Sequence, residues 1–143
     1  MVRRLNKIVK LTDADVVVSS SWRILYDIQM LQVMLFNQGM TWAHKVVGKT
    51  KDFTSCRGSE IKDYLDTHDK YDVYCILDDE TDMLDEQKPF FIRTDWDVGL
   101  SEEDVSTAIR ILGQSRPMCK TCNGYGFHDD GLCTCRRDGI KDE

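Results

Sequence analysis

The apolar and polar positions along the chain predict strands that alternate with helices. Four short apolar runs are typical of strands: DVVVSSS (15–21), the weaker AHKVVGKT (43–50), YDVYCIL (71–77) and PFFIRT (89–94). The three consecutive valines of the first run favour a strand that is buried on both faces, as strands of a parallel sheet are.

Two segments in the first half of the chain have helical spacing. Residues 2–11 are expected to form a short helix, because Leu5, Ile8 and Val9 fall on one face. Residues 21–39 are expected to form one long helix that ends at Gly39, a residue suited to the C-terminal cap. Its broad apolar stripe consists of Ile24, Leu25, Ile28, Leu31, Met34 and Leu35.

Two helices are expected in the second half. Residues 57–68 read as a short helix whose inward-facing residues are Ile61, Tyr64 and Leu65. Residues 99–113 read as a helix with Ser101 as its N-cap and Asp104 at the third helical position, a variant of the capping box.

This alternation predicts a three-layer α/β domain, in which helices cover both faces of a parallel sheet. The domain is expected to span residues 1–115. From Met118 the sequence changes to glycine, cysteine and charged residues, so residues 116–143 are expected to form a separate small tail.

Composition narrows the class of protein without identifying it. Of the 143 residues, 41% are apolar, and no apolar run approaches the length of about 18 residues that a membrane-spanning helix needs. The formal net charge of −6 argues against broad, nonspecific nucleic-acid binding but leaves room for a local basic pocket. The N-terminus lacks a signal-peptide pattern, so we expect a cytoplasmic protein, in which six cysteines are not expected to form a disulfide framework.

Hydroxyl groups follow the first predicted strand directly, in VVVSSSWR. The carboxyl ends of strands are where open α/β sheets bind ligands, and serine hydroxyls with backbone N–H groups can hold a phosphate there. Arg23 could add a bidentate contact. The alternative is that one serine merely caps the following helix and Arg23 is a surface charge.

Basic residues follow the second predicted strand, in GKT and CRGSE. Lys49 or Arg57 could neutralise a phosphate, although Lys49 and Lys51 could equally be plain surface lysines. A Walker-type phosphate loop is rejected, because no glycine-rich loop precedes GKT at the required spacing.

Two adjacent aspartates, Asp78 and Asp79, end the third predicted strand, and Asp82 lies nearby. Hard carboxylate oxygens suit Mg²⁺, which commonly takes one or two carboxylates and keeps its waters. A solvated acidic turn is the alternative.

The tail contains four cysteines within 17 residues: Cys119, Cys122, Cys133 and Cys135. This CxxC and CxC pair is close to the spacing of a structural zinc site, and His128 could replace one cysteine. Zn²⁺ would supply the folding energy of so short and polar a segment. An unstructured tail with reactive thiols, or a redox pair, is the alternative.

Together, VVVSSSWR, GKT, RGSEI, ILDDETDM and FIRTDWDVGLSEEDVSTAIRIL resemble, in this order, the haloacid dehalogenase (HAD) phosphohydrolase superfamily. The closest branch is the small HAD domains associated with RNA-repair proteins, and the resemblance covers about residues 3–112. It implies that Ser19, with Ser20 or Ser21 as alternatives, binds the substrate phosphate, and that Arg23 contacts it.

The resemblance also implies roles for the residues after the later strands. Lys49, with Arg57 as its competitor, corresponds to the basic residue of the third family motif. Asp78 and Asp79 correspond to the acidic motif that holds Mg²⁺. In the tail, CxxCxGxG is similar to half of the zinc modules of J-domain chaperones, which implies a zinc knuckle.

One family motif is missing. The family ends its first, central strand on DxD, which carries the nucleophile and the general acid/base. Here Asp13 and Asp15 precede a strand and run straight into the serine motif, so the first strand and its DxD are interpreted as absent. The neighbouring strands could close on each other, another polypeptide could donate the strand, or the native protein could be longer.

Two functions are therefore expected. The first is a Mg²⁺-dependent phosphohydrolase acting on a nucleotide or a nucleic-acid end, weak or inactive as this chain alone and completed by another protein chain. The second is a catalytically inactive HAD-like binding protein that uses its phosphate site and zinc knuckle to dock a partner.

Overall fold

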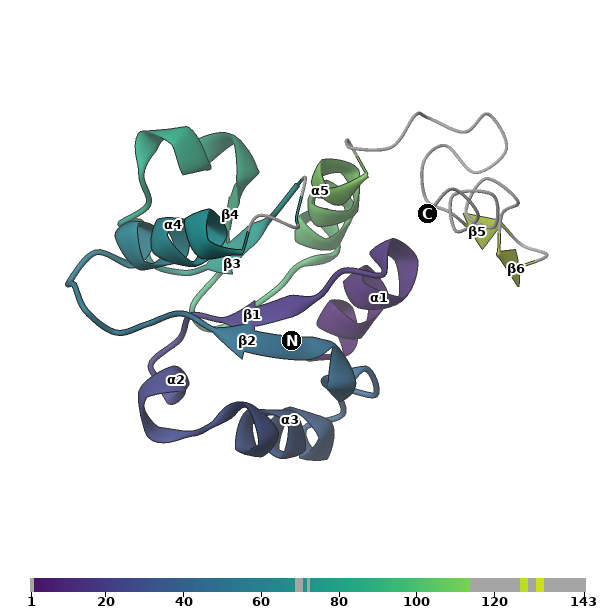
Figure 1. Cartoon of the computed structure of the whole chain (residues 1–143). Coiled ribbons are helices and arrows are strands. Elements are labelled where there is room, and N and C mark those ends of the chain that lie inside the picture. Colours follow the sequence, from purple (N-terminus) through teal and green to yellow (C-terminus); the bar gives the residue numbers. More distant parts are fainter. Residues whose placement is uncertain (1, 69–70, 72, 114–126, 129–130, 133–143) are drawn as a thin grey trace, which may run out of the picture.

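The computed structural model describes residues 2–68, 71, 73–113, 127–128 and 131–132 (Figure 1). Helices and strands alternate as α1 (Val2–Thr12), β1 (Val16–Val18), α2 (Trp22–Leu25), α3 (Ile28–Asn37), η1 (Ala43–Lys45), β2 (Val46–Lys49), α4 (Arg57–Thr67), β3 (Ile76–Asp78), η2 (Asp85–Phe90), β4 (Phe91–Arg93) and α5 (Glu102–Leu112). Strands β5 (Phe127–His128) and β6 (Gly131–Leu132) form an antiparallel pair. None of the described helices is long and apolar enough to cross a membrane.

The four main strands form two parallel pairs. Strand β1 pairs with β2, and β3 pairs with β4, so the predicted parallel α/β class is confirmed. The strands do not form a single sheet, because no described strand pairs with both β1 and β3 and these two do not pair with each other. Within the described part of the chain, β1 and β3 therefore each have a hydrogen-bonded strand on one edge only.

Helix α1 packs on both halves of the molecule. Its Ile8 lies in an apolar cluster with Val105 of α5 and Ile92 of β4. Its Val9 lies in a second cluster with Val46 of β2. Figure 1 shows α1 beside α5 on one side and β1 on the other.

Helix α4 also contacts both pairs of strands. Ile61 packs against Ile76 of β3. Tyr64 lies against Gly48 of β2, where a Cβ atom would collide with the Tyr64 hydroxyl. Since α1 and α4 each contact both pairs, they hold β1 and β3 in one arrangement.

The prediction of one long helix at 21–39 is wrong, because the chain forms two helices there, α2 and α3, with a break between them. Asp27 adopts an extended backbone, and its side chain accepts a hydrogen bond of 2.8 Å from the Met30 N–H, so it starts a new helix. As a result Ile24 and Leu25 are 56% and 74% exposed, whereas Leu31 is fully buried. Gly39, at φ 101°, ends α3 as expected.

The capping box of α5 is confirmed. The Ser101 hydroxyl accepts a hydrogen bond of 3.0 Å from the Asp104 N–H, and the Asp104 carboxylate accepts one of 2.8 Å from the Ser101 N–H. By contrast, Val16, Val17 and Val18 of β1 are half-buried, so the prediction that this strand is buried on both faces is wrong.

Candidate functional site

The loop after β1 carries the candidate phosphate-binding serines, and Arg23 fixes its shape. The Arg23 guanidinium donates from Nη1 to the carbonyl oxygens of Ser19, at 2.6 Å, and Ser20, at 3.0 Å. Arg23 is only 6% exposed, so it is not a surface charge. Ser21 is the N-cap residue of α2 but makes no side-chain capping hydrogen bond, so its hydroxyl is not used to cap that helix.

A buried carboxylate that the sequence interpretation missed holds Arg23. Glu60 of α4 is 1% exposed, and its Oε2 lies 2.5 Å from Arg23 Nη2. Its Oε1 accepts hydrogen bonds from the N–H groups of Phe53 and Thr54, at 3.1 and 3.2 Å. The signal in the sequence was its position next to Ile61, one helical turn before Tyr64, on the side of α4 that faces inward.

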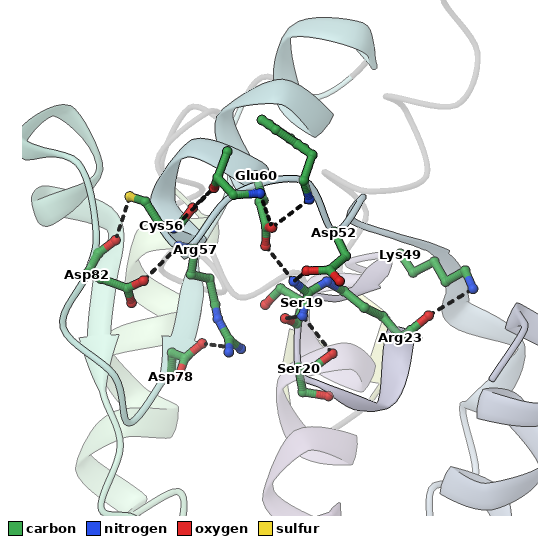
Figure 2. A network of polar contacts seen from close by, with 12 residues as sticks. Ser19, Ser20, Arg23, Lys49, Asp52, Cys56, Arg57, Glu60, Asp78 and Asp82 are labelled. Atoms are coloured by element: carbon green, nitrogen blue, oxygen red, sulfur yellow. Dashed lines mark hydrogen bonds and ion pairs between the residues drawn. The ribbon is translucent and has the colours of Figure 1, made fainter. Parts of the chain in front are cut away.

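An ion pair occupies the carboxyl end of β3. Arg57, the first residue of α4, places Nη1 at 3.1 Å from Oδ2 of Asp78, whose side chain is 6% exposed. Asp78 Oδ1 accepts a hydrogen bond from the Glu80 N–H, and Asp82 accepts one from the Arg57 N–H at 2.7 Å. Figure 2 shows this pair facing the serine loop with Arg23.

Of the two competing basic residues, Arg57 and not Lys49 contacts the acidic motif. Lys49 Nζ donates to the carbonyl oxygens of Arg23 and Tyr26, both at 2.9 Å, and so supports the turn between α2 and α3. Lys51 is exposed and lies 3.6 Å from Asp63. This geometry favours Arg57 for the basic role that the resemblance assigned first to Lys49.

The described residues do not form a complete metal site. Asp78 is already paired with Arg57, and Asp79 is exposed. No group of three or more His, Cys, Asp or Glu side chains within the described part of the chain is placed to hold a metal ion. Two carboxylates can suffice for Mg²⁺ when phosphate and water complete its shell, but here Arg57 competes for one of them.

The DxD residues lie at the opposite end of β1 from the serines, as the sequence interpretation expected. Asp13 follows α1 with φ 57°, in the left-handed region that aspartate tolerates. Lys45 pairs with Asp13 at 2.9 Å and with Asp15 at 3.4 Å, and the Tyr71 hydroxyl donates to Asp15 at 2.8 Å. At about 3.3 Å per residue, Asp15 is roughly 13 Å from Ser19, so neither aspartate faces the serine loop.

Two buried polar atoms near the site have no partner among the described residues: Arg23 Nε and Thr50 Oγ1. Thr50 follows β2, and its N–H donates to the Val18 carbonyl beside Ser19. Buried polar groups without a hydrogen-bond partner are uncommon in native structures.

The four tail cysteines, Cys119, Cys122, Cys133 and Cys135, lie outside the described residues, as does the expected boundary at 115–116. The two described cysteines, Cys56 and Cys75, are free thiols. Burial raises the pKa of Cys75 to about 12, so this thiol is neutral at physiological pH.

Comparison with known proteins gives one match. The model of a family described as the HAD domain in Swiss Army Knife RNA repair proteins matches residues 1–105. Neither the curated proteins nor the solved structures contain a significant match to the chain.

Proposed function

The chain belongs to the family of HAD domains in Swiss Army Knife RNA repair proteins, and on that basis we propose that it is the larger part of a phosphohydrolase that acts on a phosphomonoester at a nucleic-acid end. One observation carries this proposal. The serine loop after β1 and the Arg57–Asp78 pair after β3 face each other at the carboxyl ends of two parallel strand pairs (Figure 2). Ligands of α/β sheets bind at this edge.

In this proposal the residues of the site bind the phosphate and neutralise its charge. The hydroxyls of Ser19 and Ser20 donate to phosphate oxygens, and the Arg57 guanidinium supplies positive charge and a fork of donors. Arg23 donates hydrogen bonds to the carbonyl oxygens of Ser19 and Ser20 and pairs with Glu60, so it stabilises the serine loop. Asp78 orients Arg57 through their ion pair.

In this proposal Asp78 and Asp79 bind Mg²⁺. Arg57 would have to release Asp78 Oδ2, and the remaining oxygen ligands would come from the phosphate, from water or from outside the described residues. The ion would neutralise negative charge at the phosphate.

The nucleophile is proposed to come from an extended segment that lies between β1 and β3. Hydrolysis by this family proceeds through a carboxylate nucleophile in line with the leaving group, and basic residues alone do not replace it. Asp13 and Asp15 are at the wrong end of β1 to act. A strand paired with the open edges of β1 and β3 would complete one sheet and could present a carboxylate at its carboxyl end.

The alternative function is a catalytically inactive phosphate-binding protein. The specific observation in its favour is that two carboxylates of the site already have cationic partners, Glu60 with Arg23 and Asp78 with Arg57. Under both functions the tail is proposed to bind Zn²⁺ through its four cysteines.

A phosphate-release assay tests the proposal, with RNA oligonucleotides that carry a 5′ or a 3′ phosphate. The purified chain should release phosphate slowly at most, and any release should need Mg²⁺, fall in Asp78→Asn and persist in Asp13→Asn. Fast turnover that is lost in Asp13→Asn would instead place the nucleophile at Asp13. If the chain neither releases phosphate from these oligonucleotides nor binds either phosphorylated end, both functions are refuted.

A further inference from the structure

Glu60 binds both the segment that follows β1 and the segment that follows β2. Through Oε2 it holds Arg23, which belongs to the segment after β1. Through Oε1 it accepts the N–H groups of Phe53 and Thr54, which belong to the segment after β2 (Figure 2). Because α4 itself contacts β2 and β3, a single carboxylate ties both loops to the helix that begins with Arg57.

The position of Arg23 determines the backbone of the serine loop. Its Nη1 donates to the carbonyls of Ser19 and Ser20, and its Nη2 is directed to Glu60. A guanidinium has a planar fork of donors, so the direction of Nη2 also fixes the direction of Nη1. Removing the charge of Glu60 would therefore loosen Arg23 and, through it, the carbonyl groups of Ser19 and Ser20.

Stability alone does not explain this pair. Replacing a buried ion pair with apolar side chains of similar volume is often neutral or stabilising, so such a pair is weak evidence for a stabilising role. One buried atom of this network, Arg23 Nε, also has no partner among the described residues. An unpaired buried polar atom lowers stability, so this atom argues against stability as the sole role of the network.

We propose that Glu60 is a positioning residue of the phosphate site, which holds the Ser19–Ser20 loop through Arg23 in the arrangement that binds phosphate. This inference rests on the proposed function. It also assigns Arg23 to support of the loop and leaves direct phosphate contact to the serines and Arg57.

The variant Glu60→Gln separates the two arms of the network. Glutamine keeps the length and a carbonyl oxygen that can accept from Phe53 and Thr54, but it lacks the charge that holds Arg23. Inorganic phosphate should bind about tenfold more weakly to this variant, the factor that corresponds to one charge-assisted hydrogen bond. In a Ser19→Ala/Ser20→Ala background the same substitution should have little further effect, because Glu60 acts through that loop.

The matched control is Asp52→Asn. Asp52 also approaches Arg23 Nη2, at 3.4 Å, but its side chain is 51% exposed, so phosphate affinity should change less than twofold. If Glu60→Gln fails to fold, Arg23→Lys serves in its place. It keeps a positive charge for Glu60 but loses the fork that reaches Ser19 and Ser20, so the same loss of affinity is expected.

An NMR comparison without phosphate distinguishes failure of this inference from failure of the proposed function. In Glu60→Gln, or in Arg23→Lys if that variant replaces it, the amide signals of Ser19 and Ser20 should shift. The signals of Phe53 and Thr54 should shift as well in Glu60→Gln, because their acceptor loses its charge, but should stay close to wild type in Arg23→Lys. Unchanged serine signals would overturn the positioning role, as would a folded variant with wild-type phosphate affinity. If the serine signals shift in the variant but the wild-type protein binds no phosphate, Glu60 still positions the loop and the proposed function is refuted.

Discussion

Arg57 Nη1 lies 3.1 Å from Asp78 Oδ2, so the first residue of α4 neutralises the last residue of β3. The guanidinium thus contacts the carboxylate that a Mg²⁺ ion would need. Under the proposed function Arg57 and Mg²⁺ therefore compete for Asp78, and a change in one of them should alter the binding of the other.

Replacing Arg57 with glutamine should tighten Mg²⁺ binding, by up to about tenfold, because Asp78 loses its cationic partner. Calorimetric titration with MgCl₂ measures this effect. The control is Lys51→Gln, which removes an exposed cation of the loop that precedes α4 and should leave Mg²⁺ affinity unchanged. Equal or weaker Mg²⁺ binding in Arg57→Gln would contradict the proposed ligand role of Asp78.

Gly58→Ala should destabilise the link between α4 and the acidic loop. A Cβ atom at Gly58 would lie 2.7 Å from both Gln87 Oε1 and the Leu84 backbone nitrogen, and 3.0 Å from the Asp82 carbonyl oxygen. Gln87 is 1% exposed and bonded to the Gly58 carbonyl, so it has little room to move. We expect the free energy of unfolding, measured in urea, to fall by roughly 1–3 kcal/mol.

The neighbouring substitution Ser59→Ala is the control for Gly58→Ala. It should change stability by less than about 0.5 kcal/mol, since it removes no hydrogen bond found in this part of the chain. Equal stability of the Gly58→Ala variant and wild type would mean that the Asp82–Gln87 segment does not pack against α4 as described.

Cys75 should resist alkylation in the folded protein at pH 8, because burial raises its pKa to about 12 and the thiolate is the reactive form. Peptide mapping after iodoacetamide treatment measures this rate for each cysteine. A Cys75 that is modified as fast in buffer as in urea would contradict its burial.

The same pKa shift gives stability a pH dependence. The pKa of Cys75 is raised from 9.0, so the folded state holds this proton more tightly than the unfolded state. Its contribution is fully present below pH 9 and is lost as the pH rises from 9 towards 12. The difference in stability between wild type and Cys75→Ala should therefore shrink over that interval.

The tail should bind one zinc ion per chain through Cys119, Cys122, Cys133 and Cys135. Elemental analysis of protein purified without chelator measures the ratio, which should fall towards zero in Cys119→Ser/Cys122→Ser and stay at one in Cys56→Ser. Wild-type protein without zinc would rule out the knuckle.

Local patterns in the sequence predicted the elements but not the contacts between them. The capping box of α5 was recognisable because Ser101 and Asp104 are three residues apart and interact with each other's backbone. The break before α3 was missed because the apolar stripe continues across Asp27, whose capping role depends on one backbone conformation.

The site was predicted in part for the same reason. The serines and Asp78 follow apolar strands directly, and this position made them recognisable. The pairing of Arg57 with Asp78 joins residues 21 positions apart, and that of Arg23 with Glu60 joins residues 37 apart. No periodicity encodes such contacts, so neither Glu60 nor the ion pair of Arg23 was predicted.

The central claim is that the carboxyl ends of β1 and β3 form a binding site for a terminal phosphate. Its most direct test compares the equilibrium binding of three forms of one RNA oligonucleotide at a fixed salt concentration. One form carries a 5′ phosphate, one carries a 3′ phosphate, and one has only hydroxyl ends. The phosphorylated RNA should bind at least about tenfold more tightly, and Ser19→Ala/Ser20→Ala should abolish that preference. Equal affinity for phosphorylated and hydroxyl ends in the wild-type protein would contradict the claim.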